Sequence, residues 1–284
     1  MKNILLVLIS IFFISSLSAQ KTQAYQIYNA KGKAVSVDKM LKNLDNADII
    51  LFGEFHNNPI SHWLEYEVGE YLCSEYEVTF GAEMFEADNQ EDFDRYLQNA
   101  INKEIFDSLV RLWPNYETDY EQLVMLAKRE GSRFIATNIT RRYASMVHKG
   151  GFEALDSLPE SEKAWIAPLP IEYDPELSCY KGMMGMMMGH ASPNLPKAQA
   201  IKDATMAHFI LENFEPGVKF IHYNGSYHSD NYESILWYLK RKKPELNYIT
   251  ISTVTQKNVN KLYDDNKGIA DFIIVVDSNM TTSY

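Results

Sequence analysis

The chain has 284 residues, of which 46% are hydrophobic and 23% are charged, with 27 Lys and Arg against 38 Asp and Glu. These fractions are typical of a globular protein, and they argue against a collagen-like, coiled-coil or disordered chain. The formal net charge of −11 repels phosphate backbones, so we expect no nucleic-acid partner. The two cysteines, Cys73 and Cys179, are too few for a four-thiolate zinc site, and their spacing does not show whether they pair.

The first 19 residues have the layout of a cleavable secretory signal peptide. Lys2 precedes an apolar run from Ile4 to Leu17, and small residues follow up to Ala19. The alternative, a membrane anchor, needs about 20 apolar residues, which is more than this run provides. No cysteine stands near the expected cleavage site to carry a lipid. We therefore expect residues 20–284 to be exported to the periplasm or the cell exterior, without a transmembrane span or a lipid anchor.

Short apolar runs alternate with helical patterns along most of the chain. Strands are predicted at 48–52, 77–82, 133–137, 219–223, 248–254 and 272–276, and helices at 61–72, 89–101, 120–129, 197–214 and 232–240. This alternation predicts an α/β fold, with a mainly parallel sheet flanked by helices. The proline-rich segment at about 151–196 breaks the alternation and contains KGMMGMMMGH at 181–190. We expect it to form a helical cap inserted into a single α/β domain.

Polar residues follow several of the predicted strands. Strand 48–52 runs into Gly53–His56 (GEFH), strand 77–82 into Glu83, strand 133–137 towards Arg141, and strand 219–223 into Gly225–His228 (GSYH). Because ligands of open α/β sheets bind at the carboxyl ends of the strands, we expect a single cleft rim that contains Glu54, His56, Glu83, Arg141 and His228. The glutamates and histidines of this set are candidate ligands of a divalent metal such as Mn, Co, Zn or Fe. The alternative is a structural polar network in which Glu54 pairs with Arg141.

The methionine-rich run of the predicted cap permits three interpretations. Flexible, polarizable methionines suit an irregular apolar surface, so lid packing is the first. The second is a wall for a flat apolar cofactor such as haem, with Met184, Met187, Met188 and His190 as cofactor-binding residues, and the third is a Cu(I) site. We expect the run to fold over the strand ends and to leave several methionines partly exposed. Tyrosinate can hold ferric haem iron, and the candidates for this role are Tyr116, Tyr120 and Tyr143.

Six segments that span most of the chain match one protein family in the same order. They are ILFGEFHNNPISH at 50–62, GAEMFEADNQ at 81–90, the aromatic segment at 113–120, FIATNITRR at 134–142, KAQAIKDATMAHFI at 197–210 and FIHYNGSYHSD at 220–230. Together they resemble the ChaN-like haem-binding proteins, a branch of the Tiki/TraB/erythromycin-esterase-like superfamily. The resemblance implies an α/β domain with a helical cap and a role in haem binding linked to iron uptake. It also implies a stacked haem pair across a homodimer, with tyrosine as iron ligand.

The same resemblance supports a second hypothesis. The Tiki branch of the superfamily looks like metal-dependent proteases that use Gly-x-x-His segments and a glutamate, and Gly53–His56, Glu83 and Gly225–His228 match that scheme. The leading hypothesis is thus an exported haem-binding protein in iron or haem acquisition. The alternative is a divalent-metal-dependent hydrolase with Glu54, Glu83 and Arg141 as catalytic residues, in which the metal activates water and a glutamate acts as base.

Overall fold

The computed structural model describes residues 23–186 and 192–284, and within them eight strands form one sheet. The strands are β1 (Tyr25–Asn29), β2 (Ala34–Val35), β3 (Ile49–Glu54), β4 (Val78–Glu86), β5 (Arg133–Asn138), β6 (Lys219–Gly225), β7 (Tyr248–Gln256) and β8 (Phe272–Asp277). Their order across the sheet is β2-β1-β8-β7-β3-β6-β4-β5. All pairs from β8 to β5 are parallel, whereas β1 runs antiparallel to both of its neighbours. The predicted α/β class is confirmed.

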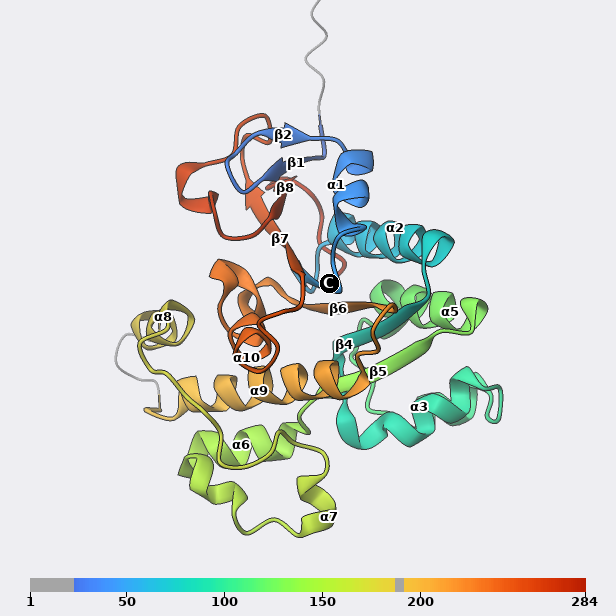
Figure 1. The fold of residues 1–284 in the computed structure, drawn as a ribbon, viewed down its shortest axis with the longest axis vertical. Helices are drawn as coiled ribbons and strands as arrows, with labels where there is room; N and C mark the ends of the chain where they lie inside the picture. The colour runs from blue at the N-terminus through green and yellow to red at the C-terminus, as the bar shows by residue number, and fades with distance from the viewer. Residues whose placement is uncertain (1–22, 187–191) are drawn as a thin grey trace, which may run out of the picture.

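Helices cover both faces of the sheet. They are α1 (Val37–Leu44), α2 (Pro59–Glu75), α3 (Gln90–Leu97), α4 (Lys103–Leu109), α5 (Glu121–Glu130), α6 (Arg141–Gly150), α7 (Glu160–Lys163), α8 (Ser178–Met186), α9 (Leu195–Asn213) and α10 (Ile235–Lys242). Helices α2 and α5 pack on one face and α9 and α10 on the other (Figure 1). All six residues of β3 are buried. Ile50 and Phe52 face α2, and Ile49 and Leu51 face α9 and α10, so the strand is apolar throughout because both of its faces are covered.

Two local features bring polar side chains to the carboxyl ends of the central strands. Asn58 caps α2 by accepting hydrogen bonds from the backbone N–H groups of Ile60 and Ser61, so the helix begins two residues earlier than predicted. The expectation that the second predicted strand ends at residue 82 is wrong, because β4 continues to Glu86 through an irregularity in its pairing with β5. Such a bulge re-aims side chains, and it places Glu83 inside the strand, where it is buried.

The described part of the expected cap contains a 3-10 turn at Phe152–Leu155 and helices α7 and α8. Helix α8 packs against α9 through Cys179, Tyr180 and Ala200. The signal-peptide prediction and the candidates Met187, Met188 and His190 fall outside the described residues. Both cysteines are free thiols in the structure. Among residues 23–186 and 192–284, no helix combines the length and the apolar character needed to cross a membrane.

Candidate functional site

A carboxylate–imidazole pair stands at the end of β3. Glu54 is the last residue of the strand and is buried, and its Oε1 lies 2.5 Å from Nδ1 of His56. The same oxygen accepts a hydrogen bond of 2.8 Å from the hydroxyl of Tyr120. The side chain of His56 is 34% exposed, whereas that of Glu54 is fully covered. His56 is therefore the part of this pair that a ligand in solvent meets first.

A second imidazole lies between two carboxylates. Nε2 of His228 is 3.1 Å from Oε1 of Glu83, and Nδ1 is 2.5 Å from Oδ1 of Asp203. The other oxygen of Glu83 accepts the backbone N–H of Gly225 at 2.8 Å, and the other oxygen of Asp203 accepts the hydroxyl of Tyr180 at 2.9 Å. All three members of this group are buried. Each carboxylate is thus held by a further donor, which fixes the orientation of His228.

The two groups meet at Gly225, the last residue of β6 and the partner of Glu54 in the β3–β6 register. A Cβ atom built on Gly225 would lie 2.9 Å from Nε2 of His56 and 3.6 Å from Oε2 of Glu83. Only a residue without a side chain leaves room for the His56 ring at this point. The structure therefore brings four predicted residues into one cluster, which we call the rim cluster: Glu54, His56, Glu83 and His228.

Arg141 lies outside the rim cluster. It is the first residue of α6, its side chain is exposed, and its backbone N–H donates to Oε1 of Glu86 at 3.1 Å. Glu54 is paired with histidines rather than with Arg141, so the expected alternative of a Glu54–Arg141 ion pair is not what the structure shows. Of the expected rim, Arg141 is the one member that the fold places elsewhere.

Three buried polar residues next to the rim cluster were not anticipated from the sequence. His62 and Glu65 lie on α2, with Nδ1 of His62 3.0 Å from Oε2 of Glu54 and 3.1 Å from Oε2 of Glu65. Asp203 lies on the buried face of α9. Helices α2 and α9 are buried over much of their surface, so no clear apolar stripe in the sequence marks these three residues as buried.

The electrostatics of the rim cluster favour ionised pairs. Burial opposes the ionisation of Glu54, but hydrogen bonds from the neighbouring histidines outweigh it and lower its pKa to about 2. Burial likewise disfavours the charged form of His228, but the charges of Glu83 and Asp203 raise its pKa to about 10. The pKa of His56 is also raised, because Glu54 and Glu83 outweigh the cost of burial. At neutral pH the rim cluster therefore contains buried ionised side chains, and the partly exposed imidazole of His56 lies between them and the solvent.

The three tyrosine candidates are all buried. Tyr120 donates to Glu54, and Tyr143 donates to Oε2 of Glu162 at 2.7 Å. The hydroxyl of Tyr116 is enclosed in the core without a hydrogen-bond partner. Burial raises the pKa of all three phenols, that of Tyr143 to about 12, which disfavours the tyrosinate form that would bind iron. In this conformation none of the three presents its hydroxyl to a ligand at the surface.

Helix α8 contacts the neighbours of His228. The hydroxyl of Tyr227 donates to the carbonyl oxygen of Cys179, and Tyr180 of the same helix reaches Asp203. Met184, on the following turn of α8, is 40% exposed. An exposed methionine therefore lies on the helix that contacts the neighbours of His228.

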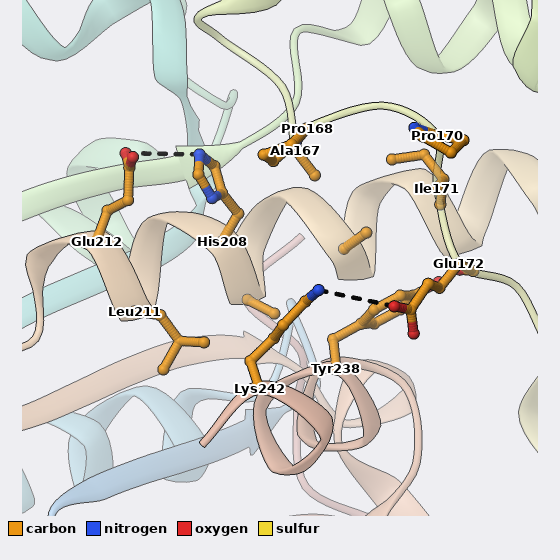
Figure 2. Close-up of a pocket in the computed structure, with 12 residues that line it drawn as sticks. Ala167, Pro168, Pro170, Ile171, Glu172, His208, Leu211, Glu212, Tyr238 and Lys242 are labelled. Atoms are coloured by element: carbon orange, nitrogen blue, oxygen red, sulfur yellow. Dashed lines mark hydrogen bonds and ion pairs between the residues drawn. The ribbon is translucent and has the colours of Figure 1, made fainter.

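A separate apolar cavity of about 330 Å³ lies away from the rim cluster. Its lining residues are Ala167, Pro168, Pro170, Ile171, Glu172, Ala204, Ala207, His208, Leu211, Glu212, Tyr238 and Lys242. Figure 2 shows two ion pairs at its border, His208 with Glu212 at 3.5 Å and Lys242 with Glu172 at 3.6 Å. None of these lining residues belongs to the rim cluster, so the cavity is not part of the candidate site.

The sequence from 40 to 239 matches the family model described as haem-binding uptake, Tiki superfamily, ChaN. A solved structure of ChaN of Campylobacter jejuni with cofacial haem is 18% identical, with a TM-score of 0.67 over 90% of this chain and 98% of that chain. A Bacillus cereus protein is 13% identical, with a TM-score of 0.51 over 89% of this chain and 95% of that chain. The type III effector HopBA1 is 12% identical, with a TM-score of 0.50 over 86% and 94% of the two chains. No curated protein matches significantly.

Proposed function

Because the chain belongs to the ChaN family of haem-binding uptake proteins in the Tiki superfamily, we propose that it is an exported haem-binding protein of haem or iron acquisition. The observation that carries this proposal is the family match, which extends from residue 40 to residue 239 and includes both halves of the rim cluster. A homodimer around the bound haem is part of the proposal.

The residues around the rim suit a flat apolar ring with a metal at its centre. Trp113 is partly exposed and packs edge-on against His56, with 4.9 Å between the ring centroids. Met184 adds an exposed thioether side chain on α8. A haem bound here would supply an iron atom that can accept a nitrogen or oxygen ligand from the protein. His56 is the candidate for this ligand, because its side chain is 34% exposed and Glu54 holds its other ring nitrogen.

We expect titration of the purified protein with haem to give a saturable shift of the Soret band at micromolar haem. His56→Ala should change the shape or position of the band, because it removes the proposed ligand, while the far-ultraviolet circular dichroism stays that of the wild type. Sedimentation of the loaded and free protein tests the proposed dimer. A wild type that gives no saturable shift would refute haem binding.

A substitution of Met184, compared with a matched control, tests whether helix α8 contacts the bound haem. Met184→Ser should weaken haem affinity about tenfold, because burying a side chain of this size contributes about 1.5 kcal/mol. Met125→Ser is the control, since Met125 is similarly exposed, at 45% against 40%, but lies on α5. Equal haem affinities of the two variants, measured by fluorescence quenching, would show that α8 does not contact the ligand.

A second candidate function is a divalent-metal-dependent hydrolase. The observation that favours it is the approach of both His56 and Glu83 to Gly225, which brings two Glu–His pairs together as one group of nitrogen and oxygen donors. A bound metal would supply an activated water, and Glu54 or Glu83 would hold the proton that this water loses. We expect a Mn, Co or Zn ion bound at this cluster to be lost in His56→Ala, as measured by elemental analysis. Retention of the ion in that variant would count against the hydrolase.

A further inference from the structure

A second cluster of side chains of the types that bind metals lies in the interior between β3 and α2, next to the rim cluster. Glu54, His62 and Glu65 each offer one ligand atom, these atoms lie within 4.8 Å of one another, and all three residues are buried. Oε1 of Glu65 is buried without a hydrogen-bond partner, and Oε2 of Glu54 competes with Oε2 of Glu65 for the single nitrogen Nδ1 of His62. Buried polar atoms in proteins are nearly always satisfied, so this arrangement requires an explanation.

The separations of the ligand atoms fit a small cation. Nδ1 of His62 lies 3.0 Å from Oε2 of Glu54 and 3.1 Å from Oε2 of Glu65. Nitrogen and oxygen ligands of a zinc-like ion are about 2.0–2.2 Å from the metal, so neighbouring ligands are about 3.0–3.5 Å apart. One histidine and two carboxylates is a donor set that zinc, manganese and ferrous ions accept.

The neighbours of His62 orient its ring in the way that is usual for a metal-binding histidine. Nε2 of His62 donates to the backbone carbonyl oxygen of His56 at 3.2 Å and lies 3.6 Å from Oδ2 of Asp119. A histidine whose Nε2 carries the proton presents a free lone pair on Nδ1, and Nδ1 is the atom that faces both carboxylates. Asn115 donates to Asp119 at 2.7 Å and so fixes this outer carboxylate.

The charge of the cluster also favours a cation. Two ionised carboxylates in a buried site repel each other and are costly to desolvate, whereas a divalent ion balances both of their charges. We infer that Glu54, His62 and Glu65 bind one divalent transition-metal ion of the zinc or manganese type. This site is distinct from a metal at Glu83 and His228, and it does not depend on the proposed haem binding. Because Glu54 also holds His56 through its other oxygen, the ion would position the exposed imidazole of the rim.

Protons can balance the same charges, and this alternative makes the opposite predictions. If His62 is charged and Glu65 is protonated, the cluster is neutral without an ion. Burial and the charge of Glu54 raise the pKa of Glu65, and the carboxylates outweigh burial to raise the pKa of His62 to about 11. Glu65→Gln then mimics the protonated acid and leaves stability unchanged or increased. With a metal ion, the same variant removes a ligand and the stability that the ion contributes.

Elemental analysis of Glu65→Gln and its matched control Glu83→Gln tests the inference. Each protein is saturated with ZnCl₂ or MnCl₂, passed through a desalting column and measured without haem. We expect about one ion per chain in the wild type and in Glu83→Gln, and less than about 0.2 in Glu65→Gln. A chelator should lower the Tm of the wild type but not that of Glu65→Gln.

Two results would overturn the inference. The first is a wild type that holds no ion after loading and has the same Tm with metal and with chelator. This result would show that protons, not a metal ion, balance the charges of the cluster, and it does not depend on whether the variants fold. An ion that is lost in Glu83→Gln but kept in Glu65→Gln belongs to the rim cluster instead. Visible absorption of the Co²⁺-loaded wild type gives an independent check, because Co²⁺ held by protein ligands in a four- or five-coordinate site has much more intense ligand-field bands than the aqueous ion.

Discussion

An Asp203→Ala variant should have a free energy of unfolding about 3–5 kcal/mol below that of the wild type, the loss expected when one partner of a buried ion pair is removed. Asp203 is fully buried, and its two oxygens accept from His228 at 2.5 Å and from Tyr180 at 2.9 Å. The substitution leaves both donors in the interior without this acceptor. Urea denaturation measures the loss, with Asp156→Ala as the control, since Asp156 is exposed. A loss below about 1 kcal/mol would show that water replaces the carboxylate.

The pH dependence of stability should change in the same variant. The folded pKa of His228 is raised to about 10, above an ordinary value of 6.5, so its charged form stabilises the fold. This contribution is complete below about pH 6.5 and is lost as the pH rises towards about 10. Removing Asp203 takes away one of the two carboxylates that raise this pKa. The decrease in unfolding free energy between pH 7 and 10 should therefore be smaller in Asp203→Ala, and an equal decrease would contradict the assignment.

Gly53→Ala should lower the free energy of unfolding by about 2–3 kcal/mol, within the range expected for overpacking. A Cβ atom on Gly53 would lie 2.8 Å from Cα of Ser226 and 3.0 Å from the carbonyl oxygen of Ile251. Both are backbone atoms next to the central strand, so they cannot yield without moving strand β7 or the turn that follows β6. Thermal unfolding measures the effect, and a loss of 1 kcal/mol in a chain of this size corresponds to about 2–4 °C in Tm.

Gly225→Ala is the informative comparison for Gly53→Ala. At Gly225 the new Cβ would meet the side-chain ring of His56, which is 34% exposed, rather than backbone. We expect a loss of about 1 kcal/mol or less in stability but a displaced His56, and hence a change in ligand binding at the rim. If Gly225→Ala destabilises as much as Gly53→Ala, the ring of His56 is held more rigidly than its exposure indicates.

The residues at the strand ends were predictable because strands have a simple local signature. The apolar run before Gly53 and the run before Asn224 both indicate buried strands, and parallel strands bring their carboxyl ends to one edge of the sheet. The approximate neighbourhood of Glu54, His56, Glu83 and His228 followed from this rule. The extension of β4 through Glu83 did not, because a bulge depends on the pairing with β5 rather than on the sequence of β4 alone.

The helical partners were not predictable in the same way. His62, Glu65 and Asp203 lie on helices α2 and α9, which are buried over much of their surface, so their polar residues do not stand out against a clear apolar stripe. On such a helix the sequence pattern around a charged residue is the same whether that residue faces solvent or a buried carboxylate. Arg141 shows the converse, since it follows a strand end but its side chain points to solvent at the start of α6.

The sequence by itself determined the fold class, the approximate positions of the central strands and the polar residues at their carboxyl ends, because hydrophobic periodicity is a local property. Only the tertiary structure decided that β6 lies between β3 and β4, which brings Gly225 against His56 and places Glu83 next to His228. It also decided that His62 faces two carboxylates and that Asp203 completes the second group. Strand order and helix rotation arise from packing between distant segments, and no local pattern encodes which oxygen meets which nitrogen.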